Sequence, residues 1–267
     1  MEMTKGAFRM IEPSSCRFTR NLYKYPHIHG DYELIFCLSG KAVAFIDKEE
    51  YVLTSGKGIF VFPNQLHFYN TLETGQFGVL VFKPDIVPTF KDKLSRRIPL
   101  NPVFDFFDDS ELLAIINSMR CDYDYLADTN FLRLTGYTNF IMDYVYKKIK
   151  FTRVSHAEAE LFEQIVEYCN QHYKKGIVLA DLSKALLVNS NRISKVFGLN
   201  MKMGIPQYVE SLRFSDACHL LENTDYSIAR VSEEAGFGSI RSMNRAFESF
   251  LKTTPREYKK IMKQKYK

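Results

Sequence analysis

Three histidines and one glutamate in the N-terminal part of the chain carry side chains that bind metal ions or hydroxyl groups. His27 and His29 are separated by one residue, Glu33 follows them, and His67 lies in a later polar stretch. Imidazole nitrogens and carboxylates are common ligands of Zn²⁺ and Fe²⁺. The same groups hydrogen-bond the hydroxyls of a sugar-like molecule, and they also occur as structural side chains of a barrel. We expect a small-molecule pocket first, with a structural role and a metal site as alternatives.

A second candidate set is polar and basic and lies in the C-terminal half. Arginine and asparagine make paired hydrogen bonds to base edges in the major groove of DNA, and lysine contacts phosphate. We expect Arg192 and Arg241 to contact bases. The full set of expected DNA-binding residues is Ser190, Asn191, Arg192, Ser194, Lys195, Lys202, Ile240, Arg241, Ser242, Asn244, Arg245 and Lys252.

Two helix-turn-helix patterns would position these residues. In the second pattern, apolar residues of 228–235 fall on one helix face, Gly236 breaks that helix, and Ser239 can cap the next one. A helix-turn-helix unit presents its second helix to the major groove. The expected recognition helices cover residues 190–197 and 240–247, and a helix over 206–221 joins the two units.

The pattern occurs twice in matching register, and the second copy has one more residue in its turn. The matched pairs are Leu182 and Val231, Ile193 and Met243, Phe197 and Phe247, and Tyr208 and Tyr258. A single such pattern also fits an ordinary pair of core helices. Two copies in one chain favour binding to double-stranded DNA.

The second copy resembles the signature of the AraC family of bacterial transcription regulators. The signature positions are occupied by Ile228, Val231, Ser232, Gly236, Phe237, Phe247, Pro255 and Tyr258. The resemblance implies a sensor domain in the N-terminal half, a DNA-binding domain in the C-terminal half and no enzyme activity. The family usually has a glycine after each recognition helix, where this chain has Lys202 and Lys252. This departure predicts a different loop, with Gly204 taking over the turn in the first copy.

The first half of the chain predicts short strands separated by turns. Residues 32–38 form a nearly continuous apolar run, typical of a central strand, and Ser39, Gly40 and Lys41 predict a turn after it. Residues 66–70 and 76–82 are expected to be separate strands. At least six short strands predict a small antiparallel barrel. Residues 83–108 are rich in proline and predict an irregular connection.

The polar residues of this barrel resemble the cupin motifs. His27, His29, Glu33 and Gly40 fit the first motif well, whereas the spacing before His67 fits the second motif poorly. Sensor domains of the AraC family commonly carry such a pattern, and many bind sugars without a metal. We therefore expect His27, His29, Glu33 and His67 to contact the effector, with no metal and no other cofactor.

The predicted fold class is α+β, because strands are followed by helices. We expect a cupin-like antiparallel β-barrel over 1–105, a helical dimerisation segment over 106–150, a linker over 151–156, and an all-α DNA-binding domain over 157–267. A helix starting at Asp128 or Thr129 carries a broad apolar stripe. Such helices commonly make the dimer contact in this family, and simple packing onto the barrel is the alternative.

Charge and composition agree with this division. The net charge is +5, and residues 1–150 carry as many basic as acidic residues, so the excess lies in the half that would face phosphates. The basic C-terminal tail supplies much of this excess. No apolar run of about 18 residues occurs, which predicts no membrane span. The five cysteines are far apart and indicate neither a disulfide framework nor a cysteine zinc site, which fits the cytoplasm.

The sequence therefore predicts a cytoplasmic, homodimeric DNA-binding regulator controlled by a small, sugar-like molecule in the N-terminal barrel. No catalytic residues are expected. Two alternatives stay open at this point. One is a metal-dependent cupin enzyme, and the other is a DNA-binding protein that needs no ligand.

Overall fold

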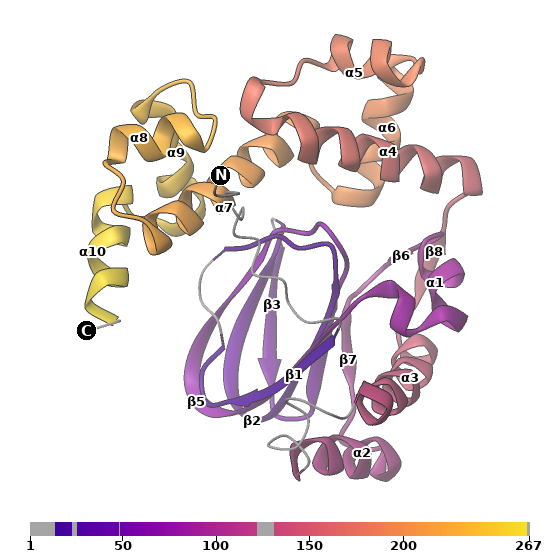
Figure 1. The fold of residues 1–267 in the computed structure, drawn as a ribbon. Helices are drawn as coiled ribbons and strands as arrows, with labels where there is room; N and C mark the ends of the chain where they lie inside the picture. The colour runs from indigo at the N-terminus through magenta and orange to yellow at the C-terminus, as the bar shows by residue number, and fades with distance from the viewer. Residues whose placement is uncertain (1–13, 23–25, 48, 122–130, 266–267) are drawn as a thin grey trace, which may run out of the picture.

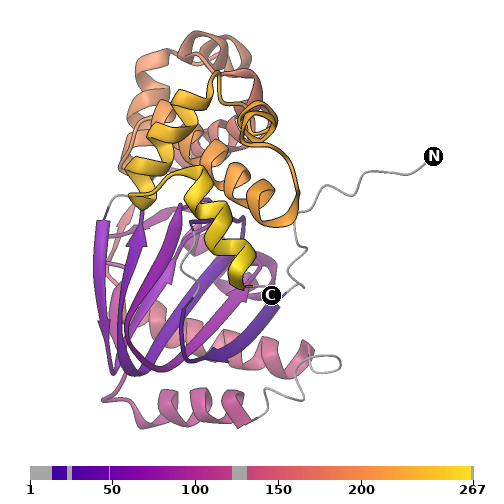
Figure 2. The same cartoon turned by 90° about the vertical axis from the view of Figure 1, so that its left-hand side faces the viewer.

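Strands make up most of the N-terminal domain, and helices make up the C-terminal domain. The computed structural model of the protein describes residues 14–22, 26–47, 49–121 and 131–265. The helical domain lies over one end of a curved antiparallel sheet, and helices α2 and α3 lie toward the other end (Figure 2). The predicted α+β class, with a barrel-like sheet before the helical domain, is confirmed.

The sheet is antiparallel throughout, and its central strand is the long β2. The strand order is β1-β5-β2-β4-β7, and β3 pairs with the second half of β2. The strands are β1 (Ser14–Thr19), β2 (Tyr32–Ile46), β3 (Glu49–Thr54), β4 (Lys57–Val61), β5 (His67–Phe82), β6 (Arg97–Pro99), β7 (Val103–Asp105) and β8 (Phe151–Arg153).

The turn predicted at Ser39, Gly40 and Lys41 is wrong, because β2 continues through these residues. The pairing with β5 shifts register there, as in a β-bulge. Gly40 has φ +87°, and a Cβ on it would lie 2.6 Å from the carbonyl oxygen of Glu73. The glycine therefore allows β2 and β5 to approach closely and bend at the bulge while both strands continue. For the same reason the segments 66–70 and 76–82 are parts of one strand rather than two.

Both faces of the first half of β2 are buried, which explains its continuous apolar run. Leu34 and Phe36 face outward and pack against helices. Ile35 and Cys37 face the inside of the curved sheet with Tyr69. A strand covered on both sides has no polar alternation to show in its sequence.

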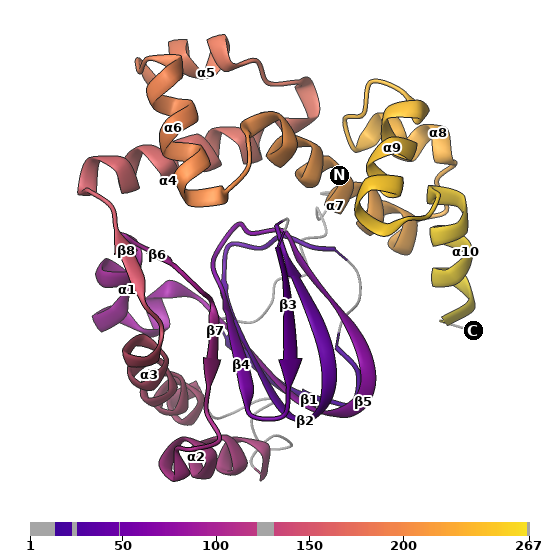
Figure 3. The same ribbon diagram turned by 180° about the vertical axis from the view of Figure 1, so that it is seen from behind.

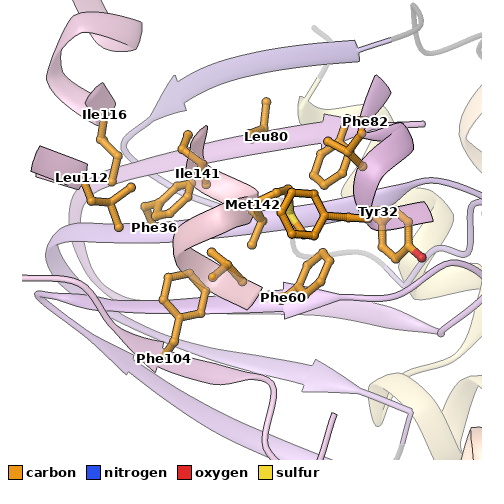
Figure 4. Close-up of a cluster of buried hydrophobic side chains, with 14 of the residues drawn as sticks. Tyr32, Phe36, Phe60, Leu80, Phe82, Phe104, Leu112, Ile116, Ile141 and Met142 are labelled. Carbon is orange, nitrogen blue, oxygen red and sulfur yellow. The ribbon is translucent and has the colours of Figure 1, made fainter. Parts of the chain in front are cut away.

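Helices α1, α2 and α3 cover the outer face of the sheet. Leu112 and Ile116 of α2, together with Ile141 and Met142 of α3, lie against Phe36 and its aromatic neighbours (Figure 4). Each fully buried side chain of this size stabilises the fold by about 1.5–3 kcal/mol. The apolar stripe of the predicted dimerisation segment therefore packs largely onto the barrel, as in the alternative interpretation. The predicted helix start at Asp128 or Thr129 lies outside the described residues.

Residues 83–108 are more regular than the sequence predicted. They contain a 3₁₀ turn (Pro84–Ile86), helix α1 (Pro88–Leu94), and strands β6 and β7. Proline occupies a first-turn position in both helical segments, where its missing N–H has no intrahelical partner to lose. Strand β6 pairs with β8, so the predicted linker is fastened to the N-terminal domain.

The C-terminal domain contains two similar helical units joined by α7. Ser155 caps α4 in a capping box with Glu158, as predicted for this serine. The α-helices are α2 (Ser110–Cys121), α3 (Phe131–Lys148), α4 (His156–His172), α5 (Leu179–Leu186), α6 (Ser190–Met201), α7 (Ile205–Asn223), α8 (Ile228–Glu234), α9 (Ile240–Leu251) and α10 (Pro255–Lys265). Helix α7 contributes Tyr208 to the core of the first unit and Phe214 to that of the second.

Candidate DNA-binding surface and sensor site

The two predicted recognition helices exist, and each runs about one turn further than expected. They are α6 and α9, the second helices of the first unit (α5 and α6) and the second unit (α8 and α9). The predicted caps are present: Asn189 accepts a hydrogen bond from the Asn191 amide, and Ser239 accepts one from the Ser242 amide. Such caps satisfy amides that the first helical turn leaves unpaired.

The matched apolar residues of the repeat hold the two recognition helices in the same way. Ile193 and Phe197 in α6, and Met243 and Phe247 in α9, are fully buried. The opposite faces are open to solvent. The exposed members of the expected DNA-binding set are Asn191, Arg192, Ser194, Lys195, Lys202, Ile240, Arg241, Asn244, Arg245 and Lys252, and the half-buried ones are Ser190 and Ser242.

The two lysines that replace the usual glycines take the glycine conformation themselves. Lys202 has φ +51° and Lys252 has φ +53°, and each ends its recognition helix. The left-handed region costs a non-glycine residue about 1–2 kcal/mol. The expectation that Gly204 takes over the turn is wrong, because Gly204 has an ordinary extended backbone and precedes α7.

Lys202 lies apart from the other predicted DNA contacts of the first unit. It is at the C-terminal end of α6, three helical turns from Arg192. That end borders a cavity whose lining includes residues of the N-terminal domain. The sequence grouped Lys202 with the DNA-binding residues, whereas the structure places it at the boundary between the domains.

Helix α7 sets the spacing of the two recognition helices. It has 19 residues, which gives a length of roughly 28 Å at 1.5 Å per residue. The two units lie at its two ends (Figure 1). Successive major grooves on one face of DNA are about 34 Å apart. The helix is therefore of the right order to present two recognition helices to successive grooves.

In the sensor domain, the structure brings His27, His29, Glu33 and His67 together. One ligand atom from each lies within 4.8 Å of the others. The Nε2 atom of His29 is 3.4 Å from one Glu33 oxygen, and that of His67 is 3.8 Å from the other. Strands β2 and β5 hold Glu33 and His67, and a backbone bridge pairs His27 with His67. We call these four residues the histidine cluster.

Glu33 and His67 are buried, His27 and His29 are half-buried, and the carboxylate of Glu33 is held in the charged form. Burial alone raises the pKa of Glu33, but hydrogen bonds to His29 and His67 outweigh it and hold that pKa well below its ordinary value. Burial lowers the pKa of the His29 imidazole, yet Glu33 raises it above its ordinary value overall. The Tyr69 hydroxyl donates a hydrogen bond of 2.6 Å to Glu33 and fixes the orientation of the carboxylate.

A cavity of about 250 Å³ lies next to the histidine cluster, where the N-terminal domain meets α4 and α6. The barrel contributes Tyr32 and Asp47 to its lining, α4 contributes Phe162, and the end of α6 contributes Met201 and Lys202. The four residues of the histidine cluster are not in this lining, although their chain neighbours Gly30 and Gln65 are.

Apart from Lys202, which was assigned to DNA binding, sequence reasoning missed the charged residues of this cavity. Burial raises the pKa of Asp47 to about 7, against the hydrogen bond from Gln65 and the charge of Lys202. Lys91 and Arg97 line the same cavity from the region predicted to be irregular. Nothing in the spacing of these residues marks them, because Asp47 lies in the turn after β2, Lys91 in α1 and Arg97 in β6.

The sequence predicted no membrane-spanning helix and neither a disulfide framework nor a cysteine zinc site. Within the described ranges, no helix has the length and apolar character needed to span a membrane. The five cysteines are free thiols, and three of them are buried.

Two family models match this chain and together cover most of it. The AraC-like ligand binding domain matches residues 10–120, and the helix-turn-helix domain matches residues 182–261. These matches coincide with the curved sheet and with the two helical units. The N-terminal domain is therefore a ligand-binding domain, and the C-terminal domain is a helix-turn-helix domain.

Named relatives and solved structures agree with these matches. The transcriptional activator RhaR of Mannheimia succiniciproducens is 19% identical over 279 residues, which span 97% of this chain and 96% of that protein. The melibiose operon regulatory protein of Escherichia coli K12 is 23% identical over 132 residues, which span 49% of this chain and 43% of that protein.

The likeness to a solved structure extends over both domains. The crystal structure of ToxT from Vibrio cholerae O395 superposes with a TM-score of 0.61 at 15% identity, covering 94% of this chain and 98% of that one. Such low identity shows the fold alone. Together with the two family models and the repeated helix-turn-helix units, these findings show that the chain belongs to the AraC family of transcription regulators.

Proposed function

We propose that this regulator is controlled by a small, sugar-like effector that binds in the cavity between the ligand-binding domain and the first helix-turn-helix unit. It would act in the cytoplasm, on double-stranded DNA, and without catalysing a reaction. The names of its relatives support a sugar, since one of them regulates a melibiose operon. The observation that carries the proposal is the position of the cavity.

The cavity is lined by both domains. An occupant would touch Asp47 and Gln65 of the ligand-binding domain and Asn200 and Lys202 of the first unit. A ligand changes a conformational equilibrium only when it binds one arrangement better than the other. A molecule that bridges the two domains has such a preference, because its contacts exist only when the domains meet in this way.

The chemistry of the lining favours a neutral, hydroxyl-rich molecule. Aromatic faces are supplied by Tyr32, Phe62 and Phe162. The charged residues of the lining balance in number, with Lys91, Arg97 and Lys202 against Asp47, Glu49 and Glu163. A lining of balanced charge offers both donors and acceptors, which suits hydroxyl groups better than a single anion.

A carboxylic acid is the competing class of effector. Structures of ToxT have been solved with an unsaturated fatty acid and with a substituted butenoic acid. At 15% identity that likeness is a likeness of fold, so the acid enters here as a comparison ligand in the experiment. A contact between the effector and His27, His29, Glu33 or His67 stays a prediction.

For the DNA, we propose that Arg192 and Arg241 contact base edges and that Lys195 and Arg245 contact phosphates. All four side chains are exposed on the two recognition helices. Asn191, Ser194, Ile240 and Asn244 would complete the surface. Ser242 would contribute less, because its hydroxyl lies 3.0 Å from the capping hydroxyl of Ser239.

We also propose that two copies associate through the outward face of α3. Leu132 is 85% exposed, and Gly136 beside it on the helix is exposed as well. This face of α3 stays exposed, because the barrel covers only the opposite face, which carries Ile141 and Val145. Sedimentation of the wild type and of Leu132→Glu would test it, and a dimer that survives the substitution at equal affinity would contradict it.

The test of the whole proposal is a binding-site selection on random duplex DNA, carried out with and without a panel of sugars and fatty acids. We expect a site with two parts about one helical turn apart, and a change in affinity with a sugar. Lys202→Ala should weaken the response to the effector, whereas the matched Lys252→Ala should weaken DNA binding alone. If no DNA sequence is enriched under any condition, the DNA-binding proposal is wrong. If only fatty acids change the affinity for DNA, the proposal of a sugar-like effector is wrong.

A further inference from the structure

We propose that a groove between the α4–α5 connection and the second helix-turn-helix unit holds one phosphate group of the DNA backbone. The groove has a volume of about 520 Å³ and is open to solvent. Its lining includes the cations Lys174, Lys175 and Arg213, none of which belongs to the expected DNA-binding residues. The inference rests on the proposed DNA binding and adds to it a contact between the two recognition helices.

The position of the groove is where a DNA strand would pass. Arg213 lies near the middle of α7, which joins the two units, while α8 supplies Ser232 and the start of α9 supplies Ser239 and Ile240. In a helix-turn-helix protein the first helix crosses the DNA backbone, and the first residues of the second helix reach the bases. A strand whose bases meet the start of α9 therefore runs past α8 and along this groove.

The lysine pair of the groove is held against the second unit. Lys174 makes an ion pair of 2.8 Å with Asp216 of α7, and a Cβ on Gly236 would lie 2.5 Å from Lys174 Cα. The backbone next to Lys175 is therefore fixed. Among the residues that the structure describes, Lys175 has no ion-pair partner, and its side chain is exposed. A cation on a fixed backbone loses little chain entropy when it meets a phosphate.

The guanidinium of Arg213 is half-buried beside the same connection. Its Nε donates a hydrogen bond of 2.7 Å to the Tyr173 carbonyl oxygen. Its Nη2 lies next to Gly176, since a Cβ on that glycine would be 3.9 Å away from it. Burial holds the pKa of Arg213 below its ordinary value, because partial loss of water disfavours the charged form. A phosphate beside the guanidinium would stabilise this charge again.

A buried hydroxyl that lines the groove lacks a partner. Ser183 and Ser232 hold equivalent places in the two units, and Ser183 donates a hydrogen bond of 2.6 Å to the Val188 carbonyl oxygen. Ser232 is 2% exposed, and within the described part of the chain its Oγ has no hydrogen-bond partner. Buried hydroxyls are nearly always hydrogen-bonded. A phosphate in the groove would give this hydroxyl an acceptor, directly or through one water.

The charge of the groove is positive, although one of its acidic residues opposes a phosphate. Asp216 offsets Lys174, so the excess of positive charge rests on Lys175 and Arg213. Glu233 lines the groove and is exposed. Its carboxylate would repel a phosphate at this distance. Removal of the Glu233 charge should therefore strengthen DNA binding, and removal of the Lys175 charge should weaken it.

The salt dependence of DNA binding by the full-length protein tests the proposal. Each phosphate contact contributes about 0.9 to the slope of log affinity against log salt concentration. We expect a slope smaller by about 0.9 in Lys175→Ala, so that this variant loses about 3-fold less affinity than the wild type between about 50 and 200 mM salt. Lys83→Ala is the matched control, because Lys83 is an exposed lysine of the ligand-binding domain, and its slope should equal that of the wild type.

A second measurement locates the phosphate on the DNA. Duplexes with a neutral methylphosphonate at one position at a time are titrated with the wild type and with Lys175→Ala. The wild type should lose affinity at a position between the bases that α6 and α9 contact. Lys175→Ala should show no further loss at that position, because its partner charge is already gone. Glu233→Gln should bind the unmodified duplex more tightly than the wild type does.

The two equivalent serines separate the groove from the stability of the fold. Ser183→Ala loses a hydrogen bond and should lower the melting temperature. Ser232→Ala removes an unpaired hydroxyl, so it should leave the melting temperature unchanged or raise it, and it should weaken DNA binding. An equal fall of the melting temperature in both variants would show that the Ser232 hydroxyl already has a partner, and would overturn its place in the site.

A salt slope and a methylphosphonate profile of Lys175→Ala that both match the wild type would overturn the phosphate site. The wild type would still select its DNA in that case, so the proposed function would stand. A wild type that binds no DNA at any salt concentration would overturn both proposals. The side chain of Lys175 is exposed, so its substitution leaves the buried cores of the two units intact.

Discussion

The two helix-turn-helix units have the same core but different surroundings. Phe197 and Tyr208 in the first unit match Phe247 and Tyr258 in the second, and all four are buried. The core of the second unit draws all its described members from the C-terminal domain. The core of the first unit also packs against Ile28 of the ligand-binding domain. One repeated sequence pattern therefore serves in two environments.

This difference gives the units different parts in the proposed regulation. The first unit borders the ligand-binding domain at the cavity residue Lys202, and helix α4, which packs against this unit, donates a 3.4 Å hydrogen bond from Asn170 to Asn64. The second unit lies at the far end of α7 (Figure 3). An effector in the cavity would contact the first unit directly and would influence the second unit only through α7.

The turns of the two units differ as well. Leu187 and Gly236 hold equivalent places and both have positive φ, +54° and +80°. Leu187 is 92% exposed. Gly236 abuts the backbone of Lys174, so it has no room for a side chain. The first turn therefore places a non-glycine residue at a strained φ but leaves its side chain in solvent. The second turn has a glycine that adopts positive φ without strain, but it packs tightly against the backbone of Lys174.

The largest expected effect is that of Gly236→Ala. A Cβ at this position would lie 2.5 Å from Lys174 Cα. The positive φ of residue 236 would add backbone strain to this steric overlap, because alanine disfavours it. We expect a loss of about 2–4 kcal/mol in the free energy of unfolding. Chemical denaturation of the full chain measures it. Gly238→Ala is the control, because a Cβ there meets nothing within 4 Å; equal losses in the two variants would refute the packing difference.

Substitution of the two exposed arginines tests whether both units contact bases. Arg192→Ala and Arg241→Ala should each weaken binding to the selected site by about 1–3 kcal/mol and relax one base position. The two relaxed positions should lie about one helical turn apart. Titration of labelled duplexes measures both effects. Arg20→Ala, an exposed arginine of the ligand-binding domain, controls for charge, and an unchanged sequence preference in either variant would remove that arginine from the base contacts.

The pH dependence of stability tests the environment of Asp47 beside the first unit. Its pKa is raised to about 7 from an ordinary value of 3.8, chiefly by burial. The folded state therefore holds the proton more tightly, and stability falls as pH rises from about 4 to 7 and is level above 7. We expect a slope on the order of 1 kcal/mol per pH unit between pH 5 and 7. Asp47→Asn should remove this slope, and parallel profiles for the two proteins would contradict it.

The smallest expected effect is a gain in stability from Leu187→Gly. Glycine adopts positive φ without strain, and the exposed leucine makes little contact to lose, so we expect about 0.5–1 kcal/mol of added stability. Leu199→Gly is the contrasting variant, because Leu199 is also exposed but lies inside α6. It should lose about 1 kcal/mol. A loss in both variants would show that Leu187 has a contact of its own.

The elements of the C-terminal domain could be predicted from the sequence because the patterns that mark them are local. Helix periodicity, capping residues and the register of two copies predicted α6 and α9, their caps and their buried faces, because these features depend on neighbours three or four residues away. The residues of the histidine cluster were also predicted, from their resemblance to the cupin motifs, and the structure brings them together at the start of β5 and near the start of β2. The continuity of β2 was missed, because a bulge and a turn have the same glycine-containing signature.

The sequence by itself determined that this chain has a sheet domain and two helix-turn-helix units, and it singled out His27, His29, Glu33 and His67. Only the tertiary structure decided that Lys202 turns toward the ligand-binding domain, that Asp47 and Arg97 share a cavity with it, and that the apolar stripe of α3 is largely used by the barrel. Local patterns record what each helix or strand needs from its neighbours in the chain. They do not record which surfaces meet, because such contacts join residues far apart in the chain that follow no common spacing.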